Sequence, residues 1–230
     1  YDSVKFFEGI AINGVKTENG FEISTQSGDT FSTKKLVFAS GLLDVMPEIK
    51  GYAECWGISI LHCPYCHGYE VKNEKTGILA NGDTAFELAK MISHWTRDLT
   101  IFTNGKSSVS TEQAQKIATH SIGVNEKEID RLEHQNGYLQ NIHFKDDSTA
   151  SVNAVYSKPK FFQSCTIPAA LGCEISEEGL LVVDKFQRTN VPGIYACGDN
   201  SNFGRSVALA VSSGSITGAF LNKALIDEAF

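Results

Sequence analysis

The sequence has 230 residues, of which 42% are hydrophobic and 20% charged, a composition typical of folded globular proteins and unlike that of disordered chains. The formal net charge is -7 and the lysines are scattered, so no basic patch is present for nucleic acid or an anionic membrane surface. There is no long apolar run and no signal-peptide pattern at the start, so we expect a cytoplasmic protein without a membrane span.

The N-terminal part of the chain predicts an antiparallel β-meander. Residues 4–38 alternate short β-rich runs with Asn-Gly and Ser-Gly-Asp turn signals. The segment "KKLVFASG" (34–41) is an apolar run that closes on small residues, which favours a buried strand ending where a bulky group approaches the backbone. Residues 42–57 then form an irregular connection containing Pro47, and we expect a domain hinge there.

The middle of the chain changes to an α/β pattern. The segment "TGILA" (76–80) is followed by a turn, an amphipathic helix and the strand "DLTIFTNG" (98–105), which predicts a right-handed βαβ unit in a parallel sheet. A helix is expected over 111–120, and further strands around the turn at 145–147. The C-terminal part predicts a strand ending in "YACGD" and a long helix whose many small residues allow close approach to another element.

The motif "HCPYCHG" (62–68) is the strongest candidate for chemistry. In a Cys-x-x-Cys pair, one thiolate attacks a disulfide and the second resolves the mixed disulfide, so Cys63 and Cys66 are the predicted redox pair. His62 and His67 flank them and are candidates for moving the thiol protons. Three alternatives remain open: a pair of core cysteines, a glutaredoxin-like site, and a zinc site. A zinc site is disfavoured because the sequence has no second Cys-x-x-Cys, and we predict no metal.

A glutaredoxin-like site is disfavoured by the residues that come after the motif. In a thioredoxin-type fold the pair begins a helix, whereas here an early glycine is followed by a strand pattern. The other four cysteines occur singly in apolar or mixed surroundings and are expected to be buried free thiols, as in reducing compartments; they are Cys55, Cys165, Cys173 and Cys197.

Two loops are candidates for cofactor binding. In "GILANGDTAFELA" (77–89) a strand leads into a helix as in dinucleotide-binding loops, but Gly82 is the only glycine in the loop itself, followed by Asp83. The loop could bind a nucleotide or serve only as a βαβ turn, and the next strand lacks the paired arginines that hold a 2'-phosphate. At the end of a later strand, Gly198 permits close approach and Asp199 can accept hydrogen bonds from ribityl or ribose hydroxyls, although such a pair is often only a turn.

The order of "FASG", "CPYCHG", "NGDTA" and "VPGIYACGD" resembles the low-molecular-weight thioredoxin reductase family of FAD-dependent pyridine nucleotide-disulfide oxidoreductases. The resemblance covers nearly the whole chain. His67 stands where thioredoxin reductases have an acidic residue, so the motif is more similar to the branch that oxidises small-molecule dithiols. By this resemblance the flavin would lie near Gly41, Gly198 and Asp199 and near Arg205, Ser206 and Val207 at the entry to the last helix, where a positive charge would stabilise reduced flavin.

The resemblance implies an α/β fold with two Rossmann-like three-layer domains. The FAD domain would be discontinuous, comprising residues 1–47 and 159–230 with the β-meander, and truncated, because the family's N-terminal Gly-x-Gly-x-x-Gly segment does not precede Tyr1. Residues 48–158 would form an inserted NAD(P)-binding-like domain that carries Cys63 and Cys66.

The resemblance also implies an FAD-dependent thiol-disulfide oxidoreductase, with the use of NAD(P)H left open. The expected partners are a small-molecule dithiol or a thioredoxin-like protein, and a second copy in a homodimer. In this family Cys66 would contact the flavin and Cys63 the substrate. The alternative functions are a non-catalytic binding or scaffold fragment of a flavoprotein and a glutaredoxin-like thiol protein.

Overall fold

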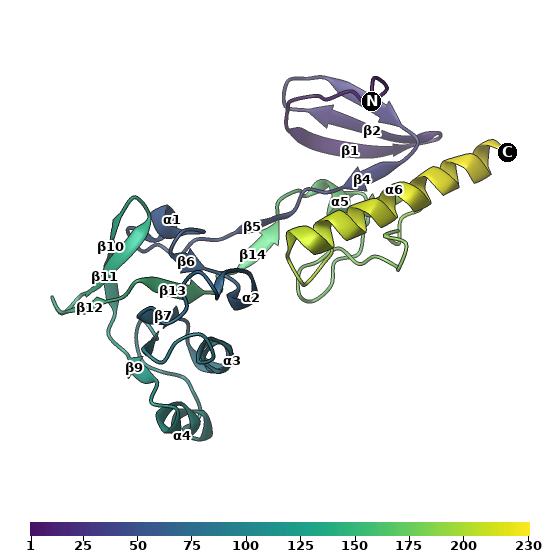
Figure 1. The fold of residues 1–230 in the computed structure, drawn as a ribbon. Coiled ribbons are helices and arrows are strands. Elements are labelled where there is room, and N and C mark those ends of the chain that lie inside the picture. The colour runs from purple at the N-terminus through teal and green to yellow at the C-terminus, as the bar shows by residue number, and fades with distance from the viewer. The chain divides into compact units, whose positions relative to one another are not determined.

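The computed structural model describes residues 1–230, which divide into two compact units (Figure 1). The discontinuous unit comprises Tyr1–Asp44 and Phe161–Phe230, and the central unit comprises Val45–Lys160. The sequence placed these boundaries after residues 47 and 158. No helix in the structure is both long and apolar enough to cross a membrane.

The discontinuous unit begins with an antiparallel meander whose strands lie in the order β1-β2-β3. The strands are β1 (Ala11–Thr17), β2 (Gly20–Thr25) and β3 (Thr30–Thr33). Gly20 turns the chain with φ +141°, and a Cβ there would lie 2.1 Å from the Thr33 carbonyl oxygen, so only glycine fits. The predicted meander is confirmed, but its first strand starts later than expected, because residues 4–10 form no strand ladder.

A two-stranded parallel sheet forms the core of the same unit. The elements around it are β4 (Leu36–Phe38), β15 (Ile194–Ala196), β5 (Leu42–Asp44), β14 (Phe161–Gln163), α5 (Ile167–Ala170) and α6 (Val207–Ala229). Strand β4 pairs in parallel with β15, whereas β5 pairs antiparallel with β14. Phe21, Phe38 and Ile194 are buried in this core. The strand predicted in "KKLVFASG" and the strand predicted to end in "YACGD" are therefore neighbours in one sheet.

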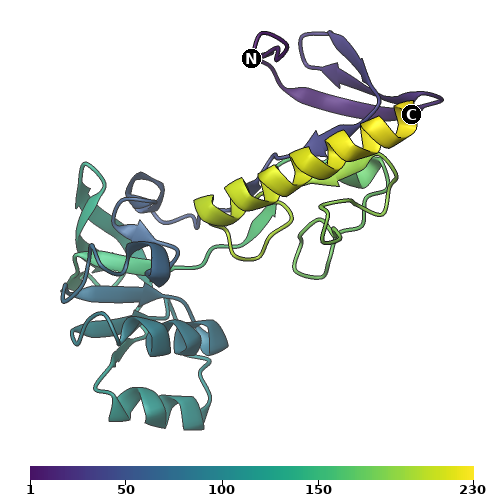
Figure 2. The same cartoon turned by 45° about the vertical axis from the view of Figure 1, so that its right-hand side comes forward.

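Helix α6 is a single uninterrupted helix (Figure 2). Ser213 and Thr217 are its buried residues. The Gly198 backbone N–H donates to the Ser213 hydroxyl at 3.0 Å, which ties the end of β15 to the helix. By contrast, a Cβ added at Gly214 or Gly218 would meet nothing within 4 Å. The close approach is thus made by small polar residues and not by the helix glycines.

The central unit is built on a five-stranded parallel sheet in the order β6-β13-β7-β8-β9. Its elements are β6 (Ile60–Leu61), β7 (Thr76–Leu79), β8 (Leu99–Phe102), β9 (Gly123–Asn125), β13 (Ala154–Ser157), α1 (Tyr52–Cys55), α3 (Gly82–Ile92) and α4 (Thr111–Thr119). On one face, Leu61, Tyr156 and Ile78 pack with Leu88 of α3 and Ile117 of α4. The βαβ prediction is confirmed.

The other face of this sheet is covered by an antiparallel sheet, so the unit has three layers. The covering strands are β10 (Ile129–Gln135), β11 (Tyr138–Phe144) and β12 (Thr149–Ser151). Their buried side chains Leu132, Ile142 and Phe144 pack with Ile60 and Val155. The strands predicted around residues 145–147 are therefore present.

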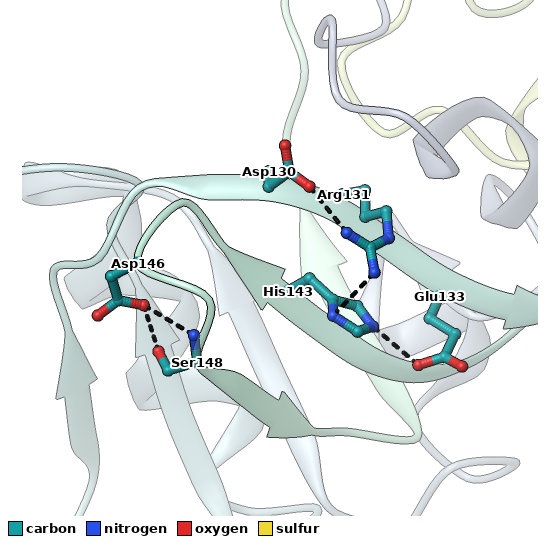
Figure 3. A network of polar contacts seen from close by, with 6 residues as sticks. All are labelled: Asp130, Arg131, Glu133, His143, Asp146 and Ser148. Atoms are coloured by element: carbon teal, nitrogen blue, oxygen red, sulfur yellow. Dashed lines mark hydrogen bonds and ion pairs between the residues drawn. The ribbon is translucent and has the colours of Figure 1, made fainter.

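The exposed side of the covering sheet carries a polar network (Figure 3). Arg131 donates to Asp130 at 2.9 Å and to Nδ1 of His143 at 3.2 Å, while Nε2 of His143 donates to Glu133 at 2.8 Å. The hydrogen bond from His143 is the first cause that holds the pKa of Glu133 below its usual value. These contacts are solvent-exposed, so they add little to stability and mark the outer face of the sheet.

Candidate functional site

Cys63 and Cys66 lie at the two ends of one helical turn, α2 (Pro64–His67). Cys63 is the N-cap residue with extended backbone, and its carbonyl oxygen accepts from the Cys66 N–H at 3.2 Å. Both thiols are free, with Cys63 half-buried and Cys66 exposed. The pKa of the Cys66 thiol is raised, first by its hydrogen bond with Cys63 and then by partial desolvation and the charges of Cys63 and Glu70. The two sulfurs are thus placed for thiol-disulfide exchange.

The turn is held in place by a glycine packed on an indole ring. Gly68 follows α2, and its N–H donates to the Pro64 carbonyl at 2.8 Å. A Cβ at Gly68 would lie 2.4 Å from Cε2 of Trp95, far inside normal contact distance. The same Cβ would lie 2.4 Å from the Pro64 carbonyl oxygen. The backbone φ at Gly68 is -64°, which any residue adopts, so the glycine is required by the close approach of Trp95 and the Pro64 carbonyl and not by its conformation.

The two histidines lie on either side of the pair, as their sequence positions imply. His62 is half-buried before Cys63, and His67 is the exposed last residue of α2. His67 lines a hollow of about 440 Å³ together with Glu70, Glu74 and Ser59. The exposed imidazole of His67 therefore opens onto a hollow that also contains two carboxylates.

A second hollow lies on the other side of the motif. It has a volume of about 510 Å³, and Pro64 and Tyr65 line it together with His94 and Trp95. Aromatic side chains thus form one wall beside the redox turn. Trp95 lies 27 positions beyond Gly68 in the chain, so no local sequence pattern connects the two residues.

The two glycines predicted to lie near the flavin each follow a strand of the discontinuous unit, and these two strands are parallel neighbours. Gly41 follows β4 with φ +66°, and Gly198 follows β15 with φ +82°. Because β4 and β15 run parallel, both loops leave the same edge of the sheet, where ligands bind in open α/β folds. A Cβ at Gly41 would meet nothing within 4 Å, and Asp199 is half-buried. The backbone is therefore open to a bulky group at this edge.

Buried acceptors without partners lie near the same strand ends. Asn200 is fully buried and donates to the Phe38 carbonyl at 2.9 Å, but its Oδ1 has no hydrogen-bond partner. Gln163 donates to the Gly179 and Asn200 carbonyls, and its Oε1 also lacks a partner. Orphaned acceptors of this kind are satisfied by a ligand that carries donors. The residues at this edge fit FAD, whose ribityl chain carries several hydroxyl groups.

The entry to α6 differs from expectation at Arg205. The Arg205 guanidinium makes a bidentate ion pair with Asp44, at 2.9 Å to each carboxylate oxygen, and lies over the Phe161 ring. The carboxylate of Asp44 therefore balances the positive charge of Arg205. Both side chains are largely buried, so water screens this ion pair little. Ser206 caps the helix by accepting from the Leu209 N–H at 3.3 Å, and Val207 is exposed.

The loop at the start of α3 is closed by the side chain of Asn81. Asn81 Oδ1 accepts from the N–H groups of Gly82 and Ser108, both at 2.8 Å. Asp83, in the first turn of the helix, accepts from Gln113 at 2.7 Å. The Gly82 N–H, which would face a pyrophosphate, is thus already occupied, and Asp83 places a negative charge beside it. The loop does not fit the pyrophosphate of a nicotinamide nucleotide.

The single cysteines are largely inert. Cys55, Cys173 and Cys197 are buried, as predicted, but Cys165 is only half-buried. Burial is the first cause that raises the pKa of the Cys55 and Cys173 thiols. No group of three or more His, Cys, Asp or Glu side chains in the structure is arranged to hold a metal ion.

A Rossmann-like unit that carries a Cys-x-x-Cys turn, inserted into a second unit with flavin-type glycine loops, defines the class of disulfide oxidoreductases with nucleotide-binding folds. The chain belongs to the pyridine nucleotide-disulphide oxidoreductase family, whose model matches residues 3–214. The resemblance and the fold class stated from the sequence are thereby confirmed.

Known relatives agree with this assignment. The chain is 30% identical to thioredoxin reductase tcpT of Claviceps purpurea, over 99% of the chain and 74% of that protein. It is 27% identical to thioredoxin reductase sirT of Leptosphaeria maculans, over 96% of the chain and 73% of that protein.

Solved structures agree as well. A Bacillus anthracis protein described as thioredoxin reductase TrxB superposes with a TM-score of 0.93 at 30% identity, over 100% of this chain and 78% of that one. An oxidoreductase from Agrobacterium tumefaciens superposes with a TM-score of 0.85 at 30% identity, over 96% of this chain and 74% of that one.

Proposed function

We propose that this oxidoreductase is an FAD-dependent dithiol-disulfide oxidoreductase in which Cys63 and Cys66 are the redox-active pair. The observation that carries the proposal is the geometry of α2, which brings Cys63 and Cys66 onto a single turn, with the Cys66 N–H donating to the Cys63 carbonyl at 3.2 Å. A glutaredoxin-like site is disfavoured because α2 ends after four residues and does not continue as a long helix.

In the proposed exchange with a dithiol substrate, a substrate thiolate attacks Cys63 of the Cys63–Cys66 disulfide, and Cys66 leaves as a thiolate. The second substrate thiolate then attacks the substrate sulfur bonded to Cys63, and Cys63 leaves with the bonding electron pair. The substrate is released as a disulfide and the protein as a dithiol. FAD, when bound, supplies the two-electron acceptor that restores the disulfide. In this scheme Cys63 would react with the substrate, and Cys66 would exchange electrons with the flavin.

His67, or His62, would take the proton of the attacking thiol. His67 is the preferred candidate, because it is exposed beside Cys66 and lines a hollow with Glu70 and Glu74. An imidazole is suited to this proton transfer because its ordinary pKa is close to neutral pH.

The FAD would be held at the edge formed by the ends of β4 and β15. Gly41 and Gly198 leave room for it, Asp199 would accept hydrogen bonds from the ribityl hydroxyls, and Ser206 and Val207 would lie at the α6 end. Arg205 would contribute less charge to the flavin than its sequence position implies, because Asp44 pairs with it.

The substrate would be a small-molecule dithiol or the dithiol of a thioredoxin-like protein, and the protein would act in the cytoplasm as a homodimer. The names of the relatives support thiol-disulfide chemistry. The Asn81 contacts at the α3 loop favour only weak and unselective nicotinamide binding at Gly82 and Asp83.

The test compares Cys66→Ser with Cys165→Ser in the intact, flavin-loaded protein. Cys66→Ser should abolish turnover of dithiols while the fold is kept, since only a thiol can exchange electrons with a disulfide. Cys165→Ser should turn over as wild type. Equal activity of both variants would show that the pair is structural. A protein that stays colourless when supplied with FAD would favour the non-catalytic scaffold alternative.

A further inference from the structure

Tyr156 is buried on the face of the parallel sheet that packs against α3. It lies in β13, where it is paired with Leu61 of β6 on one side and Ile78 of β7 on the other. Its side chain is 0% exposed and packs in the same core cluster as those two residues. The tyrosine is thus fixed on three sides by apolar neighbours.

The Tyr156 hydroxyl has no hydrogen-bond partner in this position. A buried hydroxyl without a partner loses its hydration and gains nothing in return, so it lowers stability relative to an apolar group of the same shape. Phenylalanine would keep the ring packing without this loss. The hydroxyl therefore needs a reason other than the stability of the core.

The direction of the strands brings this hydroxyl to the redox turn. Leu61 faces the α3 side of the sheet together with Tyr156, because the two residues are register partners in neighbouring parallel strands. Cys63 lies two residues after Leu61 and has extended backbone, with φ -128° and ψ 118°. Strand β6 ends at Leu61 and the chain bends at His62, so Cys63 begins the turn directly after the strand that pairs with Tyr156.

Electrostatics agrees with this placement. Burial, followed by the negative charges of Cys63 and Glu70, raises the pKa of Tyr156 to about 12. The phenol thus keeps its proton throughout the range in which thiols ionise, and it can donate a hydrogen bond but cannot act as a base. Other titratable groups also surround the turn: His62 before it, Cys66 and His67 on α2, Glu70 after it, and Lys90 and His94 at the end of α3.

We propose that Tyr156 is a positioning residue that stabilises the thiolate of Cys63 by donating its hydroxyl hydrogen to the sulfur. This inference rests on the proposed function, in which Cys63 leaves as a thiolate when the substrate disulfide forms. A thiol sulfur is a poor acceptor, so the hydroxyl has no partner in the dithiol form; a thiolate is a much better one. The Tyr156 hydroxyl therefore gains a hydrogen-bond acceptor only when Cys63 becomes a thiolate, which happens as the substrate disulfide is released. A thiolate stabilised in this way is the better leaving group.

The experiment measures alkylation of Cys63 by iodoacetamide as a function of pH, in reduced protein that carries Cys66→Ser so that one thiol of the pair remains. Peptide mass spectrometry separates Cys63 from Cys165, which is half-buried and acts as an internal control. No flavin is required. Tyr156→Phe is compared with Tyr52→Phe, which removes a buried phenol from the other core cluster of the same unit.

Tyr156→Phe should move the midpoint of the Cys63 rate profile to higher pH by about one unit. Alkylation at neutral pH should then fall only about three- to fourfold, because the less stabilised thiolate is a stronger nucleophile, and the plateau at high pH should rise about threefold. The variant and wild-type profiles therefore cross. Tyr52→Phe should leave the profile unchanged, and the profile of Cys165 should not move in any variant.

Superimposable profiles for Tyr156→Phe and its parent would overturn the inference. So would a uniform change in rate at every pH with an unchanged midpoint, which indicates altered access to the sulfur. A large fall in the urea midpoint of Tyr156→Phe would also overturn it, by showing that the hydroxyl has a structural partner. Failure of the proposed function would appear elsewhere, as dithiol turnover that survives Cys66→Ser.

Discussion

Gly68→Ala tests how strictly the redox turn depends on its contact with Trp95. The added Cβ would lie 2.4 Å from Cε2 of the indole and 2.4 Å from the Pro64 carbonyl oxygen, where ordinary contacts begin near 3.4 Å. Gly68 must therefore move by about 1 Å relative to both α2 and the indole. Overpacking of this kind costs about 1–3 kcal/mol, and the better helix propensity of alanine returns at most about 1 kcal/mol. We expect a net loss of about 1–2 kcal/mol.

The assay is urea unfolding followed by tryptophan fluorescence, which reports on the central unit because both tryptophans, Trp56 and Trp95, lie in it. With a slope of about 2 kcal/mol per molar urea, the midpoint should fall by about 0.5–1 M. A displacement of 1 Å at the sulfurs should also slow thiol-disulfide exchange, by up to about a hundredfold.

Gly218→Ala is the matched control, because it adds the same methyl group to α6 where a Cβ meets nothing within 4 Å. It should stabilise the protein by up to about 1 kcal/mol, measured by circular dichroism. Partial recovery of Gly68→Ala by Trp95→Leu would locate the clash at the indole. A Gly68→Ala protein that unfolds at or above the wild-type urea concentration would refute the argument.

Two further predictions concern the nucleotide loop and the histidines. NADPH should bind weakly and without preference over NADH in a fluorescence titration, and Asn81→Gly should tighten binding of both by freeing the Gly82 N–H; tight, NADPH-selective binding by the wild type would contradict the geometry of the loop. Replacing His62 and His67 together by Asn should slow cysteine oxidation at neutral pH by about two to four powers of ten, with a smaller loss at high pH where thiols ionise unaided. A stopped-flow profile of that double variant that matches wild type from pH 6 to 9 would eliminate both residues as proton carriers.

Local patterns in the sequence predicted most of the secondary structure and the redox pair. The meander followed from alternation and turn residues, the βαβ unit from strand and helix periodicity, and Cys63 and Cys66 from their spacing. Each of these signals is contained within a few neighbouring residues, where backbone geometry and side-chain periodicity act directly.

The positions 4–10 show where such signals fail. Their apolar and aromatic residues resemble a strand, but a strand forms only where a partner supplies a ladder of backbone hydrogen bonds. Here Phe7 packs on Phe31 of β3, and the Ile10 carbonyl accepts from the Gln26 N–H, without a strand being formed. The sequence also predicted that the charge of Arg205 would be available to the flavin. Local patterns could not reveal the ion pair that balances this charge, because Asp44 is 161 positions away in the chain.

The sequence by itself therefore determined most of the elements, the family and the Cys-x-x-Cys motif that we propose as the redox pair. Only the tertiary structure decided the long-range contacts: the indole packed on Gly68, the amide of Asn81 across the nucleotide loop, and the burial of the Tyr156 hydroxyl without a partner. These contacts join residues that are distant in the chain, and they depend on packing distances of a few tenths of an ångström. Composition and periodicity carry no record of such distances, because they describe each segment before it meets its neighbours.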